Sequence, residues 1–223
     1  MIENILLPRI IENKDWATVL FVLSFAVIAV TKSVYENRFG DFANLIFSNK
    51  YNKVYRDSSH LKSSFTVALF FVQVVSLAFF IQVSLSSFGY ASKTDWILYI
   101  QIITFLTFFI LAKYLIEKII ATSFNIEEFM EQFSLQKVTY RSYIGLILLP
   151  LNIILFYYDT FSINVTLVII AILLLYNSIT YLISIKNYQN IIFGKLFYFI
   201  LYLCALEIAP YYFMYYWFTK GSA

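Results

Sequence analysis

The sequence has 223 residues, of which 61% are hydrophobic, 21% aromatic and only 13% charged, with a formal net charge of +3. A soluble globular domain carries about 45–50% apolar and about 25% charged residues, so this composition excludes a soluble enzyme, a disordered chain and a nucleic-acid-binding domain. A single cysteine and a single histidine exclude a disulfide framework and argue against a zinc or iron–sulfur site. We therefore expect a multipass membrane protein with no cofactor, no metal and no nucleic-acid partner.

Six segments are apolar enough to cross the hydrocarbon as helices, which takes about 20 residues each. They lack the alternating pattern of transmembrane β-strands. The predicted fold class is therefore all-α, a polytopic transmembrane helix bundle in one domain over residues 1–220, followed by Gly221-Ser222-Ala223, which resembles an added linker. The predicted spans are residues 16–31, 64–88, 96–120, 143–158, 165–185 and 196–218.

The distribution of basic residues predicts how these spans face. Twelve of the 16 Lys and Arg residues lie in or beside the predicted loops 32–63, 121–142 and 186–195, and four lie on the other side. Loops rich in Lys and Arg stay in the cytoplasm. We therefore expect both termini outside, in the periplasm, with the chain in the inner membrane of a Gram-negative bacterium.

The first predicted cytoplasmic loop carries aromatic and basic residues in alternation, beginning with Phe39, Phe42 and Ile46 at helical spacing. Such a segment beside a membrane is typical of attachment to the anionic inner leaflet. Docking to a partner protein is the alternative, and we favour the leaflet. The candidate docking residues are Phe42, Ile46, Lys50, Lys53 and Arg56.

The second predicted cytoplasmic loop starts with Asn125 and Glu128, which form a capping-box pattern at a helix N-terminus. An apolar stripe follows at helical spacing, so we expect a short amphipathic helix in this loop, before the span over residues 143–158. Its acidic residues are interpreted as the polar face of that helix rather than as a divalent-cation site; they are Glu127, Glu128 and Glu131.

Polar residues within the predicted spans are the candidates for function, because they either join helices by hydrogen bonds or line a polar path. We favour the joining of helices. The spans lack small-xxx-small motifs, so we expect the helices to pack through large side chains. The candidates are Gln73, Gln101, Asn152, Asn177, Glu207 and Pro210.

Glu207 is the acidic residue placed deepest in a predicted span, near the midplane of residues 196–218. A carboxyl at this depth costs at least about 2.5 kcal/mol on insertion scales, so it should face the protein interior and have a partner. Pro210 should kink the helix beside it. We favour a neutral carboxylic acid hydrogen-bonded between helices over a proton- or ligand-coupling site.

Several strings resemble those of a known family. They are Asn13-Lys14-Asp15-Trp16, residues 39–51, residues 135–140, residues 148–152 and residues 202–210. Together they resemble an uncharacterised family of integral inner-membrane proteins from Bacteroidota, classified as a domain of unknown function. The resemblance extends over nearly the whole chain. It implies an inner-membrane location and assigns no catalytic residues.

Two functions from different classes fit these observations. The first is a non-enzymatic subunit or accessory factor of a larger inner-membrane assembly with membrane-protein partners, such as one for protein export, because no catalytic, metal-binding or phosphate-binding motif is present. The second is a small transporter or a lipid-handling membrane enzyme that uses Glu207. We favour the first.

Overall fold

The computed structural model describes residues 14–45, 51, 54–55, 63–123, 127–158 and 163–187. These residues form helices and no strand, and five of the helices are long and apolar enough to cross a membrane. The expected all-helical, multipass membrane architecture is therefore confirmed for this part of the chain. The helices are α1 (Asp15–Val34), α2 (Glu36–Ala43), α4 (Ser64–Ser87), α5 (Trp96–Ser123), α6 (Glu127–Tyr157) and α7 (Ile163–Asn187).

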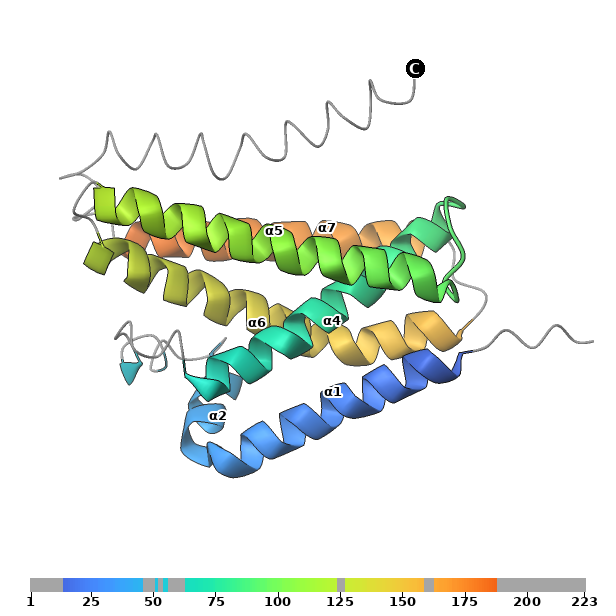
Figure 1. The fold of residues 1–223 in the computed structure, drawn as a ribbon, viewed down its shortest axis with the longest axis horizontal. Helices are drawn as coiled ribbons and strands as arrows, with labels where there is room; N and C mark the ends of the chain where they lie inside the picture. The colour runs from blue at the N-terminus through green and yellow to red at the C-terminus, as the bar shows by residue number, and fades with distance from the viewer. Residues whose placement is uncertain are drawn as a thin grey trace, which may run out of the picture.

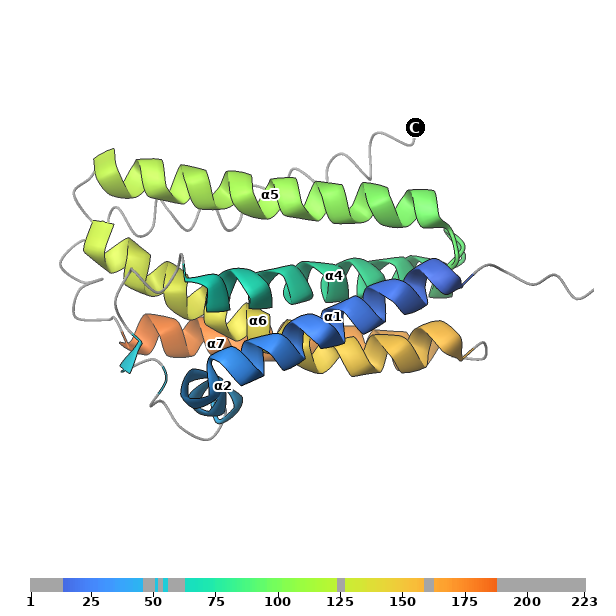
Figure 2. The ribbon, with the colours of Figure 1, turned by 60° about the horizontal axis from the view of Figure 1, so that its bottom comes forward.

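Helix α4 is the centre of the bundle, and it packs against α1, α5, α6 and α7 (Figure 1). In its membrane-spanning window 61% of the residues are buried, against 6% for α5 and 11% for α7. Figure 2 shows α5 on one side of α4, with α1 and α6 on the other. A helix that is apolar on all faces suits this central position.

Local signals in the sequence set the ends of α4 and α5. Ser63 caps α4, because its hydroxyl accepts a hydrogen bond from the Thr66 N–H. Gly89 ends α4 with a φ of 79°, a left-handed conformation that favours glycine. Asp95 then starts α5, with its carboxylate accepting from the N–H groups of Ile97 and Leu98 at 2.9 and 3.2 Å. The chain therefore reverses between α4 and α5 in a short, capped turn.

An aromatic cluster fills the end of the bundle where α1 begins. The ring of Phe79 on α4 stacks on Phe21 of α1 at a centroid distance of 4.2 Å and lies 4.5 Å from Tyr99 of α5. Phe156 of α6 packs edge-on against the same ring. Phe79 and Phe156 are fully buried. Four helices are thus joined at this end by ring contacts, each of which contributes about 0.5–1.5 kcal/mol beyond its buried area.

The structure differs from the predicted break between residues 121–142 and the span at 143–158. Helix α6 is continuous over 31 residues and carries Pro150 in its interior. The stretch from Glu127 to Tyr143 contains no glycine or proline that would end a helix. The amphipathic segment expected in the loop is therefore the first half of the same helix.

The structure also corrects the expected role of Phe42 at the other end of the bundle. Phe42 of α2 is 1% exposed and packs edge-on against Phe65 of α4, Tyr51 and Tyr143 of α6. Its ring therefore packs against protein rather than against the lipid leaflet. The segment after α1 is therefore fastened to the bundle.

Candidate functional site

Two of the predicted polar residues, Gln73 and Asn152, each take part in hydrogen bonds between α4 and α6. The Ser142 hydroxyl of α6 donates to Oε1 of Gln73 on α4 at 3.1 Å. The Asn152 amide of α6 donates to the Ser76 carbonyl of α4 at 2.7 Å and to its hydroxyl at 3.1 Å. All four side chains are buried. We call this set, Gln73, Ser76, Ser142 and Asn152, the polar seam.

Gly145 allows the two helices to approach this closely. A Cβ atom at Gly145 would lie 2.6 Å from the Cα atom of Gln73, a distance that side chains do not tolerate. The backbones of α4 and α6 therefore touch beside the seam, which brings the short Ser142 side chain within reach of Gln73. The expectation that these helices pack through large side chains alone is wrong at this crossing, because one glycine is enough for close approach.

The chemistry of the polar seam is that of a neutral hydrogen-bonded contact. Its four side chains are amides and hydroxyls, and none carries a charge. Oδ1 of Asn152 has no hydrogen-bond partner among the described residues, which leaves one buried acceptor. Hydrogen bonds between membrane helices contribute about 0.6 kcal/mol each on average. The seam can thus fix the rotation and register of α4 against α6.

A second polar contact joins α5 to α6 near the connection between them. Glu117 of α5 accepts a hydrogen bond from the Ser134 hydroxyl at 3.1 Å and pairs with Nζ of Lys137 at 3.7 Å. The Lys137 ammonium also lies 4.9 Å from the centre of the Phe133 ring. Glu117 and Ser134 are both buried. The buried carboxylate of Glu117 thus has both a hydrogen-bond donor and a positive charge beside it, which offset the cost of its burial.

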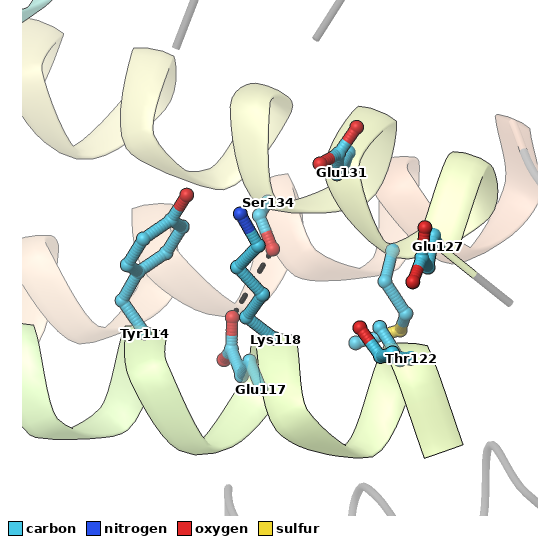
Figure 3. A pocket seen from close by; sticks show the side chains of 9 residues that line it. Tyr114, Glu117, Lys118, Thr122, Glu127, Glu131 and Ser134 are labelled. Atoms are coloured by element: carbon cyan, nitrogen blue, oxygen red, sulfur yellow. Dashed lines mark hydrogen bonds between the residues drawn. The ribbon is translucent and has the colours of Figure 1, made fainter. Parts of the chain in front are cut away.

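A groove opens beside this pair, with about 340 Å³ of empty space including the part open to solvent. Figure 3 shows Tyr114, Glu117 and Lys118 on α5 and Glu127, Glu131 and Ser134 on α6 around it. Glu127 is exposed and Glu131 half-buried. The described residues contain no group of three His, Cys, Asp or Glu side chains that could hold a metal ion. Charged and hydroxyl side chains therefore stand around a groove whose lining also contains the apolar side chains of Ala121 and Met130.

Arg38 of α2 is buried among aromatic rings at the same end of the bundle. Its guanidinium donates to the Tyr51 hydroxyl at 3.3 Å, to the Ser63 hydroxyl at 2.9 Å and to the Thr66 hydroxyl at 3.3 Å. It also lies 4.4 Å from the centre of the Phe65 ring. Burial raises the pKa of Tyr51 above its ordinary value, and the nearby Arg38 charge lowers it by less. Arg38 thus ties α2 to the start of α4.

The remaining predicted residues do not join these contacts. Gln101 of α5 and Asn177 of α7 are exposed on their helices. From the intramembrane set only Gln73 and Asn152 belong to the polar seam, each through its own serine, and Phe42 from the docking set is buried. The others lie outside the described residues; they are Ile46, Lys50, Lys53, Arg56, Glu207 and Pro210.

Sequence reasoning missed Gly145, Arg38 and the Glu117–Lys137 pair as structural determinants. Gly145 had a signal, because it is the one glycine within the six predicted apolar spans. The pair had a weaker one, since Glu117 and Lys137 both lie on the predicted cytoplasmic side. Arg38 was counted only as one basic residue of a loop, and nothing in its local pattern indicates burial.

Comparison with known proteins places this architecture in a family. Residues 17–218 match the model of a family described as a domain of unknown function, DUF4271. No curated protein and no solved structure matches the chain. The matched segment contains every transmembrane helix described above apart from the first residues of α1. The chain is therefore a member of the DUF4271 family.

Proposed function

We propose that the protein is a non-enzymatic integral subunit or accessory factor of a larger assembly in the inner membrane of Bacteroidota, with protein export as the process to test first. The observation that carries the proposal is that α5 and α6 are longer than the hydrocarbon is thick and carry charged side chains at the end where they are connected. These helices have 28 and 31 residues, or about 42 and 46 Å, whereas the hydrocarbon core is about 30 Å thick. Both therefore have length to spare for a contact outside the hydrocarbon.

Two contacts hold the connected ends of α5 and α6 in one arrangement, which supports the proposal that a partner docks there. The Glu117–Lys137 pair and the Ser134 hydrogen bond hold the two helices together. The groove beside them leaves Glu127 exposed and Glu131 half-buried. A preorganised surface loses little conformational entropy when a partner binds. This supports a partner with basic residues that contacts the groove from the membrane surface.

Reversing one charge at this groove should release the partner. We expect the wild-type chain, extracted from native membranes in mild detergent, to copurify with a stoichiometric partner, and Glu127→Lys to lose it. Glu36→Lys is the matched control, because Glu36 also lies in the first turn of an exposed helix end, and it should keep the partner. A wild-type chain that purifies as a lone oligomer with bound lipid or solute contradicts the proposal and favours a transporter or lipid-handling enzyme.

We further propose that the end of the bundle bearing the groove lies in the cytoplasm and that six spans place both termini in the periplasm. Among the described residues, that end carries Lys32, Arg38, Lys113, Lys118, Lys137 and Arg141, whereas the opposite end carries Lys14 and Lys93. This asymmetry follows the positive-inside rule.

Cysteine labelling tests this orientation. In a Cys204→Ser background, Ser92→Cys in the turn between α4 and α5 should react with an impermeant maleimide in intact spheroplasts. Asn44→Cys, which is exposed at the opposite end after α2, should react only after the membrane is opened. The reverse pattern would invert the proposed topology.

A further inference from the structure

A cleft lies between α1 and α4, in the half of the bundle where α1 ends and α4 begins. The two helices are in contact at the stacked rings of Phe21 and Phe79, and they separate from there toward the end of α1 (Figure 2). The space between them amounts to about 680 Å³, including the part open to its surroundings. We call it the α1–α4 cleft; it is lined by Val27, Ser64, Val67, Ala68 and Phe71.

The lining of this cleft changes from polar to apolar with depth in the membrane. Helix α4 has 24 residues, or about 36 Å, against a hydrocarbon core of about 30 Å. Ser64, its first residue, therefore lies at the level of the lipid headgroups, and Phe71 lies about 10 Å further in. The cleft thus has a hydroxyl at its mouth and apolar side chains within the hydrocarbon.

The size of the cleft selects among the molecules that can fill it. An apolar space that opens into the hydrocarbon is filled either by lipid or by another helix. A helix about 10 Å across occupies roughly 420 Å³ per turn of 5.4 Å, so the cleft holds less than two turns. A methylene group is about as large as a water molecule in the liquid, roughly 30 Å³. About twenty methylene groups therefore fill the cleft, which is the size of one acyl chain.

Positive charge lies near the mouth of the cleft. The Arg38 guanidinium donates to the hydroxyls of Ser63 and Thr66, on either side of Ser64 in the sequence. Lys32 is exposed in the last turn of α1, at the same end of the bundle. The N-terminus of α4 adds the positive end of its helix dipole. An anionic phosphate is therefore favoured at this level.

We propose that the α1–α4 cleft binds one phospholipid, with an acyl chain along Val67, Ala68 and Phe71 and the phosphate at the start of α4. The acyl chain fills the space that the two helices leave between them, and the Ser64 hydroxyl donates to a phosphate oxygen. The site is independent of the groove between α5 and α6. A phospholipid held here beside a partner protein agrees with the proposed function, because only a chain without a partner contradicts that function.

Returning lipid to the delipidated chain tests the site. The full chain, purified in mild detergent and freed of lipid, should bind one molecule of palmitoyl-oleoyl phosphatidylglycerol in native mass spectrometry. Val67→Trp should weaken this binding at least fivefold, because the indole ring occupies the cleft. Val67 is 57% exposed, so the larger side chain leaves the packing of the bundle intact.

Val168→Trp is the matched control on α7. Val168 is 58% exposed and does not line the cleft, so this variant should bind the lipid as the wild type does. Equal weakening by the two variants would assign the lipid to the general surface, and a wild-type chain that binds no phospholipid would leave the cleft without its occupant. A wild-type dimer that Val67→Trp separates would assign the cleft to a second copy. Each of these three results overturns the proposal.

A second variant tests the position of the phosphate. Ser64→Asp places a carboxylate at the mouth of the cleft, where it repels a phosphate, while an acidic residue in the first turn suits the helix. Phosphatidylglycerol should then bind at least threefold more weakly, whereas diacylglycerol with the same two chains, which lacks the phosphate, should bind as it does to the wild type. Equal effects on the two lipids would refute the contact between the phosphate and Ser64.

Discussion

Replacing Gly145 with alanine should lower the free energy of unfolding by about 1–3 kcal/mol, the usual cost of forcing extra volume into a packed contact. The new methyl group would lie 2.6 Å from the Gln73 Cα atom. Because this neighbour is backbone, it cannot move aside by changing a rotamer, and α4 and α6 must separate. Separation also lengthens the Ser142–Gln73 hydrogen bond. Unfolding by SDS titration in mixed micelles, followed by circular dichroism, measures the change.

Gly40→Ala is the matched control for this substitution. Gly40 lies in α2, and a Cβ atom there would meet no atom within 4 Å. Alanine is about 1 kcal/mol more favourable than glycine inside a helix, so this change should leave stability unaltered or raise it. Of the two identical substitutions, only the one at Gly145 should therefore lower stability. Equal effects would show that helix propensity, rather than the close crossing of α4 and α6, governs Gly145.

Replacing Arg38 with lysine should free α2 from the bundle while keeping the positive charge. Lysine cannot donate to Tyr51, Ser63 and Thr66 together, because it lacks the planar guanidinium. We expect a loss of about 3 kcal/mol, as for one or two hydrogen bonds to a charged group. Amide hydrogen exchange in residues 36–43 should then rise roughly a hundredfold, since each 1.4 kcal/mol is a factor of ten.

Arg141→Lys serves as the control, because Arg141 is a half-buried arginine on α6 at the same end of the bundle. It should leave exchange in α2 unchanged. If Arg38→Lys also leaves exchange unchanged, the packing of Phe42 against Phe65 alone holds α2 in place. The membrane-spanning helices should keep their protection in both variants, since neither arginine contributes to the polar seam.

Mean apolarity alone was enough to locate most of the helices. Helices α1, α4, α5 and α7 begin and end within three residues of the predicted spans. Insertion into lipid depends on the summed transfer free energy of a segment, which can be read without knowing its neighbours. The extent of α6 could not be read in this way, because its first half is amphipathic and resembles a surface helix.

The sequence did not show which polar residues face the interior of the bundle and which face outward. Gln73 and Gln101 are the same residue type in adjacent predicted spans, yet the first is 2% exposed and the second lies on an uncovered face. The difference depends on how each helix is rotated about its axis, which the packing against distant helices decides. Phe42 gave the same difficulty, because an aromatic stripe fits a lipid surface and a protein surface equally well.

The polar seam also has a consequence for biogenesis. Its partners are 69 residues apart in one hydrogen bond and 76 in the other. At about 5–20 residues per second, α4 leaves the ribosome roughly 4–15 seconds before the part of α6 that completes it. During that interval the Gln73 amide and the Ser76 hydroxyl are in the membrane without Ser142 and Asn152. The contact between α4 and α6 therefore forms only after α6 has been synthesised, around a central helix that is made first.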